Sequence, residues 1–223
     1  VEATWSTPQE PARYRDLWTP QFRRLAILCA VPWFLMDIAL YGVGLFAPSI
    51  VTGLLFGDAA TASTSFLRDD VEATAITGFT DVFLVLGFLL TIVFVSRIGQ
   101  IRLQVIGFVG MTVGLAILAA SGSGGAAAWV LAGFVIFNLM LNFGPNATTY
   151  MLPAQLFPTR LRATGHGFSA ASGKVGAVIG TFLLSPAVAA FGLSTVMGAI
   201  AVLALLGAVV TVLFRVEPSQ QLS

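Results

Sequence analysis

The sequence predicts an all-α integral membrane protein that crosses the bilayer six times. Of its 223 residues, 57% are hydrophobic and only 9% are charged, and the mean hydropathy is +0.92. A water-soluble domain carries about 25% charged residues, so this much apolar surface cannot be hidden in one soluble core. Six apolar runs of the length that a membrane helix needs and a one-sided placement of arginine complete the prediction.

The apolar runs and the turn signals between them define the expected elements in order. We expect the spans at residues 25–47, 75–96, 103–120, 127–152, 164–188 and 191–214. Between them we expect a polar loop at 57–74, a Gly/Ser turn at 121–125, a Pro- and Arg-bearing connection at 157–165 and a short hairpin at 191–194. Gly42, Gly44 and Pro48 at the outer end of the first span indicate either a simple helix end or a gate that bends over a cavity.

Basic residues set the expected orientation. Nine of the eleven Lys and Arg residues fall on one side of the six spans: Arg13, Arg15, Arg23, Arg24, Arg97, Arg102, Arg160, Arg162 and Arg215. Because cytoplasmic loops are enriched in basic residues, we expect both chain ends to be cytoplasmic and the protein to reside in the plasma (inner) membrane. The bundle at 25–214 then lies between a cytoplasmic segment at 1–24 and a cytoplasmic tail at 215–223.

The composition excludes several classes of function. The net charge of +1 and the lack of a basic tract argue against nucleic acid as a partner. Cys29 is the only cysteine, so no internal disulfide forms. The sequence holds no nucleotide-binding loop, metal cluster or nucleophile triad, so we expect no cofactor and no enzymatic activity. The first 22 residues lack the apolar core of a signal peptide, and the start at Val1 favours a fragment or a processed chain.

Two opposite charges are expected at the same depth of the membrane. With a rise of about 1.5 Å per residue, Asp37 lies about 18 Å from the start of the first span, and Lys174 lies about 15 Å into the fifth, which enters from the same side. An ionisable group in hydrocarbon costs roughly 2.5–3.5 kcal/mol and marks a candidate functional site. The alternative is a structural ion pair that locks two helices. Asp81, in the second span, has no partner that the sequence identifies.

Aromatic side chains accompany Asp37 on its helix. Trp33, Asp37 and Tyr41 are spaced four apart and therefore share one face. Core packing would also explain the two aromatic residues. The stripe makes all three candidates for the lining of a polar site.

The fourth span carries a second stripe with the same spacing, formed by Asn138, Asn142, Asn146 and Tyr150. Gly144-Pro145 predicts a bent helix, which membranes tolerate where it lines a cavity. Asn146 is therefore a candidate pore-lining residue, with Asn142 and Tyr150 as candidates beside it. For Asn138 the simpler interpretation is a hydrogen bond between helices.

Small residues surround Lys174 in the fifth span. The stretch "GHGFSAASGKVGAVIG" (165–180) contains two small-residue stripes, which predict close helix packing and no site role. His166 stands at the cytoplasmic start of this span. Capping or a contact at the headgroup level is favoured there over a proton relay.

Two stretches carry a resemblance to a known family. "WFLMDIALYGVGLF" (33–46) and "NFGPNATTYMLPAQLFPTRLRATGHGFSAASGKVGAVIG" (142–180) resemble the C-terminal half of a major facilitator superfamily transporter, and more narrowly the phosphate:proton symporter family. A third stretch, "VSRIGQIRLQVIGF" (95–108), resembles the family's loop between helices eight and nine. The resemblance implies a six-helix half of that fold, helices seven to twelve, which works with an N-terminal six-helix half in the lipid bilayer.

The resemblance also implies a site. In that family a Trp, an Asp and a Tyr on helix seven, an Asn on helix ten and a Lys on helix eleven bind phosphate. These positions fall on Trp33, Asp37, Tyr41, Asn146 and Lys174, and Asp37 would also carry the coupled proton. The implied function is secondary active transport, a proton-coupled symport of inorganic phosphate by alternating access.

Some positions depart from the family pattern. Gln155 stands where the family has Glu before its "FPTR" motif, and residues 96–101 differ from the family's D/E-K-x-G-R-R/K loop. We expect five residues to belong to the cytoplasmic gating network of such transporters: Arg97, Arg102, Gln155, Arg160 and Arg162. The stretch "GLFAPS" after Tyr41 also differs. A sugar or organic-anion porter of the same superfamily is therefore an alternative, as is a non-transporting nutrient sensor or an inactive half-transporter.

Overall fold

Long helices build the protein. The computed structural model describes residues 13–55, 66–122 and 126–216, without the side chains of 55 and 66–70, and no strand occurs in these ranges. The elements are η1 (Tyr14–Trp18), α1 (Arg23–Leu45), α2 (Ala47–Leu55), α3 (Phe66–Ile98), α4 (Gln100–Ser121), α5 (Ala127–Asn142), α6 (Pro145–Leu156), α7 (Thr159–Phe191) and α8 (Leu193–Leu213).

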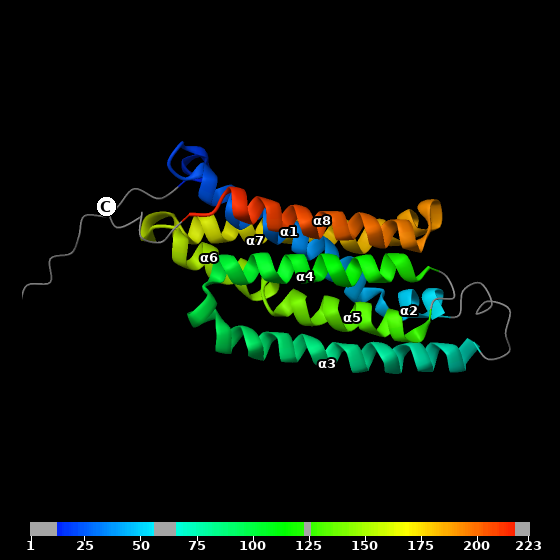
Figure 1. The fold of residues 1–223 in the computed structure, drawn as a ribbon. Coiled ribbons are helices and arrows are strands. Elements are labelled where there is room, and N and C mark those ends of the chain that lie inside the picture. Colours follow the sequence, from blue (N-terminus) through cyan, green and yellow to red (C-terminus); the bar gives the residue numbers. More distant parts are fainter. Residues whose placement is uncertain (1–12, 56–65, 123–125, 217–223) are drawn as a thin grey trace, which may run out of the picture.

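Six helical segments of the described chain are long and apolar enough to cross a membrane, and α5 and α6 together form one of them. They run side by side along a common direction, and the chain reverses at each end of the bundle (Figure 1). The predicted all-α fold with six spans is confirmed.

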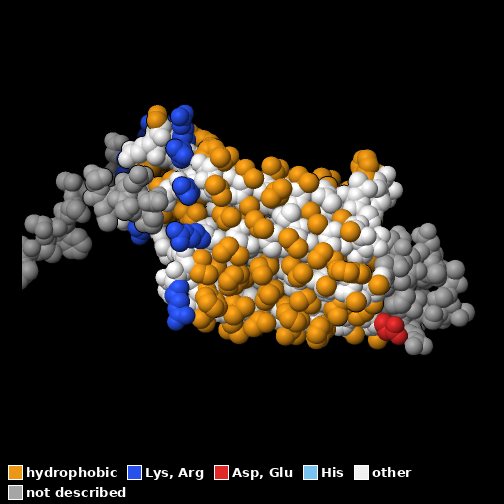
Figure 2. Space-filling view, in the orientation of Figure 1, with side chains coloured by type: hydrophobic (Ala, Val, Ile, Leu, Met, Phe, Trp, Pro, Cys, Tyr) orange, Lys and Arg blue, Asp and Glu red, His pale blue; other side chains and the backbone are white. Residues whose placement is uncertain are grey.

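The two ends of the bundle differ in their charged side chains. Lys and Arg side chains gather at the end where α1 begins, whereas hydrophobic side chains cover the middle (Figure 2). We call this end, which carries Arg23, Arg97, Arg102, Arg160 and Arg215, the basic end. The helix lengths and the apolar belt between the two ends match the form of an integral membrane protein.

The second span begins earlier than the sequence predicts. α3 starts at Phe66, so residues 66–74 of the expected polar loop are helical, while 57–65 lie outside the described residues. Five of the ten residues of "FLRDDVEATA" (66–75) are Leu, Arg, Glu or Ala, which favour helix without being uniformly apolar. Hydropathy predicts the part of a helix that lies in the hydrocarbon. The helix propensity of the following residues determines how far the helix extends beyond the hydrocarbon.

The connection expected at 157–165 is much shorter in the structure. α6 ends at Leu156 and α7 begins at Thr159, with Phe157 and Pro158 extended between them. A residue before proline is driven from the helical region, which ends α6, and proline at the N-cap is compatible with a new helix. Tighter reversals occur at Gly99 and Gly192, where φ values of 85° and 81° suit glycine.

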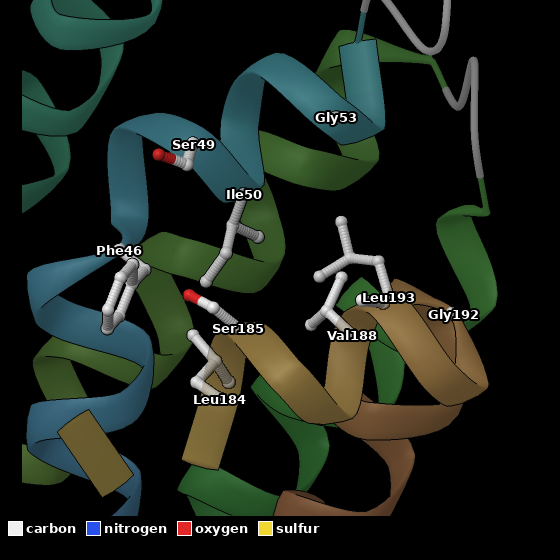
Figure 3. A pocket seen from close by; sticks show the side chains of 10 residues that line it. Phe46, Ser49, Ile50, Gly53, Leu184, Ser185, Val188, Gly192 and Leu193 are labelled. Atoms are coloured by element: carbon white, nitrogen blue, oxygen red, sulfur yellow. The ribbon is translucent and has the colours of Figure 1, made fainter. Parts of the chain in front are cut away.

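The first span is interrupted near the end that lies away from the basic end. Phe46 separates α1 from α2, which continues the chain at Ala47. A cavity of about 470 Å³ lies between α2 and the α7–α8 turn. Phe46 and Ile50 face it from one side, and Leu184, Val188 and Leu193 face it from the other (Figure 3). The helix therefore does not simply end where Gly42, Gly44 and Pro48 weaken it.

The break predicted in the fourth span is present. α5 ends at Asn142 and α6 begins at Pro145, with proline in the first helical turn. Close packing holds the break in place, because a Cβ at Gly107 of α4 would overlap the Pro145 ring and lie 3.0 Å from the Gly144 Cα. The Thr91 hydroxyl of α3 donates a hydrogen bond of 2.8 Å to the Asn142 carbonyl. A backbone acceptor at the end of α5 is thereby satisfied inside the bundle.

Candidate functional site

Glycines bring α1 and α7 into close contact. A Cβ at Gly180 would lie 2.5 Å from the Ile38 carbonyl oxygen, and one at Gly176 would overlap the Phe34 carbonyl. A Cβ at Gly173 would overlap the Trp33 ring and lie 3.0 Å from Oδ2 of Asp37. The small residues predicted to permit close packing do so here. We call Gly173, Gly176 and Gly180 the glycine seam.

The seam places Lys174 beside Asp37. Nζ of Lys174 lies 3.8 Å from Oδ2 of Asp37, so the two charges expected at one depth meet. Asp37 is 2% exposed, whereas the Lys174 side chain is 58% exposed. The carboxylate is therefore deeply enclosed, and the ammonium group stands at the accessible edge of the site.

Tyr41 completes this part of the site. Lys174 Nζ donates a hydrogen bond of 3.4 Å to the Tyr41 hydroxyl and lies 5.3 Å from the centroid of the tyrosine ring. Tyr41 is one helical turn beyond Asp37 on α1, as the stripe predicts. One cation thus touches both an acid and a phenol from the neighbouring helix.

Trp33 lies one helical turn before Asp37 on α1, whereas Tyr41 lies one turn after it. The Trp33 ring is fully buried and lies 4.3 Å from the Tyr150 ring of α6, centroid to centroid. The indole Nε1 of Trp33 and Oδ2 of Asp37 are both buried and make no hydrogen bond with the described residues. Buried polar groups are usually satisfied. The Trp33 donor is therefore left without an acceptor among the described residues, while Oδ2 has only its ion pair with Lys174.

His166 joins this group, which the sequence does not predict. Its ring meets the edge of Trp33 at 5.7 Å and 89°. α7 begins at Thr159, about two turns before His166, so the predicted capping role is wrong. The signal available was spacing: His166 precedes Lys174 by eight residues, which places both on one face of α7.

The asparagine stripe divides into two parts. Asn146 Nδ2 donates to Asn142 Oδ1 at 2.7 Å, which links the two sides of the helix break. Within the described residues, Asn146 makes no hydrogen bond or ion pair with Asp37, Tyr41 or Lys174. The structure thus gathers Trp33, Asp37, Tyr41, Lys174 and Tyr150, and it leaves Asn146 with its own neighbour.

Asn138 makes the predicted bond between helices. Its Nδ2 donates to Oδ1 of Asp81 on α3 at 3.1 Å. This contact also supplies the partner of Asp81 that the sequence could not identify. The pair lies away from Lys174 and ties α5 to α3.

The five predicted gating residues are spread over the basic end. Gln155 Oε1 accepts a hydrogen bond of 2.7 Å from Gln100 Nε2, which joins α6 to the start of α4. Arg160 pairs with Asp16 at 3.1 Å, and Arg162 Nε donates to the Phe157 carbonyl at 3.3 Å. Arg97 and Arg102 are exposed. Two of the positions that depart from the family pattern, Gln100 and Gln155, thus contact each other.

A family model agrees with this architecture. The model described as "Sugar (and other) transporter" matches residues 4–221, nearly the whole chain. It covers all six spans and the residues gathered around Asp37.

Similar curated proteins carry phosphate transporter names. "Probable inorganic phosphate transporter 1-6" of Arabidopsis thaliana is 37% identical over 190 residues, which are 82% of this chain and 36% of that protein. "Low affinity inorganic phosphate transporter 1" of Petunia hybrida is 40% identical over 176 residues, 74% of this chain and 33% of that protein. The chain spans about a third of the length of the curated relatives that it matches. The chain belongs to the sugar (and other) transporter family of the major facilitator superfamily, and within it resembles the inorganic phosphate transporters.

Proposed function

We propose that this chain is the C-terminal half, helices seven to twelve, of a proton-coupled symporter of inorganic phosphate that works by alternating access. Its relatives at 37–40% identity are named inorganic phosphate transporters, and the matched residues make up only 36% and 33% of their lengths. The observation that carries the proposal is a buried Asp37 whose Oδ2 lies 3.8 Å from Lys174 Nζ at mid-span.

The site offers phosphate the right chemistry. Phosphate oxygens are acceptors, and Lys174, the Tyr41 hydroxyl and the unpaired Trp33 Nε1 are donors from two adjoining helices. Lys174 and Tyr150 are exposed at mid-depth, where lipid would not solvate them. This face therefore lines a water-filled path shared with the N-terminal half. Asn146 lies further along the same path and contributes an amide.

Asp37 couples the proton to the anion. An ionised carboxylate beside phosphate in a low dielectric is strongly repulsive. A protonated Asp37 removes this repulsion and donates a hydrogen bond to a phosphate oxygen. Binding of proton and phosphate then favour each other, which is the thermodynamic basis of symport. When the site holds no anion, Asp37 pairs with Lys174 and is not left as an isolated buried charge.

We infer the orientation of the protein in the membrane and its functional class from the same features. The basic end faces the cytoplasm, and residues 1–24 and 215–223 extend from that side of the plasma (inner) membrane. The protein is a carrier and not an enzyme, since binding and release of the solute need no covalent step. Arg97, Arg102, Gln155, Arg160 and Arg162 lie at the basic end, where they take part in opening and closing the cytoplasmic side.

Uptake by the complete protein in proteoliposomes tests this function. With an inward proton gradient, phosphate should accumulate, while sugars and organic anions from the same panel should not. Asp37→Asn should abolish accumulation driven by the gradient but keep phosphate exchange, because the neutral amide stands in for the protonated acid. Full uphill uptake by Asp37→Asn, or accumulation of a sugar in place of phosphate, would reject the proposal.

A further inference from the structure

A cavity at the basic end lies apart from the proposed transport site. It has a volume of about 630 Å³ and lies between the ends of α3, α4 and α6 and the chain just after α8. It shares no residue with the Asp37–Lys174 group. Two arginines, Arg102 and Arg215, line it together with apolar side chains that include Ile98, Ile101, Leu152 and Leu156.

The two arginines are the only arginine residues that line this cavity, and both are exposed. Within the described residues, neither makes a hydrogen bond or an ion pair. Other arginines at this end are engaged: Arg24 donates to the Leu213 carbonyl at 3.1 Å, and Arg160 pairs with Asp16. A guanidinium group matches the geometry of a phosphate, to which it can donate two parallel hydrogen bonds.

Buried hydrogen bonds fix the walls of the cavity. One turn deeper, the Thr148 hydroxyl of α6 donates to Gln104 Oε1 of α4 at 2.7 Å. Gln104 Nε2 donates in turn to the Thr211 hydroxyl of α8 at 2.9 Å. At the rim, Gln100 and Gln155 join α4 to α6. The elements that carry Arg102 and Arg215 are thus tied together, so the cavity is preformed.

The position of the cavity selects the kind of ligand. α3 ends at Ile98 and α8 ends at Leu213, so the cavity lies where the apolar belt gives way to arginines (Figure 2). Lipid phosphates occupy this level of a bilayer, with glycerol and the first acyl carbons just below. The apolar walls favour a phosphate that carries hydrocarbon, whereas a free phosphate ion would gain nothing from them.

We propose that this cavity binds an anionic phospholipid. Arg102 and Arg215 hold the headgroup phosphate, and the apolar walls hold the glycerol and the first acyl methylenes. The bound lipid spans α3, α4, α6 and the end of α8, and so stabilises the basic end. The lipid site shares no residue with the Asp37–Lys174 group, although Arg102 and Gln155 also belong to the proposed gating residues; its test measures lipid retention and therefore does not depend on transport.

Native mass spectrometry of the complete protein tests the site. The protein is released from vesicles of equal parts phosphatidylcholine and phosphatidylglycerol, and the lipids that stay bound are identified. Phosphatidylglycerol should be enriched, and Arg102→Ala and Arg215→Ala should each lower its retention by about fivefold. The control Arg23→Ala also removes one positive charge from the same end, outside the cavity, and should retain the lipid.

Three outcomes would overturn the proposal. Equal loss of lipid from the control variant would mean that only the overall charge of this end attracts lipid. Equal retention of the two lipids by the unaltered protein would mean that the cavity does not select an anion. Displacement of phosphatidylglycerol by millimolar inorganic phosphate would mean that the cavity takes the free ion. The monodispersity of each variant in detergent separates lost binding from misfolding.

Discussion

Asp37 and Lys174 are unequal partners. The acid is enclosed and the lysine stands at the edge, so the lysine can leave the pair at little cost while the acid cannot leave its surroundings. Removing one member of an enclosed pair leaves a charge without compensation, which costs more than the pair itself contributes.

The cost of an unpaired Asp37 can be measured. Lys174→Gln should lower the free energy of unfolding by about 1–3 kcal/mol, between the values for exposed and buried pairs. The double variant Asp37→Asn/Lys174→Gln should recover most of this loss, because it removes both charges. Thermal unfolding of the two single variants and the double variant forms the cycle. Additive losses would show that the two residues are not coupled.

A substitution at Trp33 can distinguish a role in protein stability from a role in phosphate binding. Trp33→Phe keeps an aromatic ring against Tyr150 but removes Nε1–H, which is buried without an acceptor. Losing an unpaired donor costs no hydrogen bond in the empty protein. The midpoint of thermal unfolding should therefore fall only by the packing cost of the smaller buried ring, while the apparent KM for phosphate in the complete protein should rise about tenfold. A large drop in the unfolding midpoint with an unchanged KM would assign Trp33 to packing alone.

The glycine seam determines where α7 meets α1. The first and fifth spans are far apart in the chain, yet α7 carries Lys174 to Asp37 because its glycines let the two backbones approach. Hydropathy predicts both helices but not that they touch. The small-residue stripes and the matching depths of the two charges were the signals that pointed to this contact.

A pair of glycine substitutions on α7 tests the seam. Gly173→Ala should destabilise the protein by about 1–3 kcal/mol and weaken phosphate binding, because its Cβ overlaps Trp33 and crowds Asp37. The matched control is Gly167→Ala, where a Cβ meets nothing within 4 Å. The control should be neutral or stabilise by up to about 1 kcal/mol through helix propensity. Equal effects of the two substitutions on the unfolding midpoint would refute the role of the seam.

The ends of the helices are the part of the fold that the sequence predicts least well. The six spans and the break before Pro145 are visible in the sequence, because bilayer thickness and proline geometry impose them. The extension of α3 back to Phe66 and the start of α7 at Thr159 are not, because they lie outside the hydrocarbon. The capping role expected of His166 is wrong for the same reason, because the helix predicted to begin at 164 begins at 159.

The whole bundle has one charged end and an apolar belt, which predicts its direction in the membrane. Cys29 is the only cysteine and is buried, so it gives little background in labelling. Arg97→Cys at the basic end and Ala126→Cys at the other end, both exposed positions, should label from opposite sides of sealed vesicles. A membrane-impermeant maleimide should reach only the residue 97 position in inside-out vesicles. Labelling of both positions from the same side would contradict the six-span topology.

The described chain starts and finishes at the same end of the bundle (Figure 1). An even number of crossings returns the polypeptide to its original compartment. A second six-helix body can therefore be attached there by a linker that never has to be threaded through lipid. It follows that this body and the N-terminal half proposed above need not be encoded in one piece: synthesised separately and inserted independently, they should still associate within the plane of the membrane.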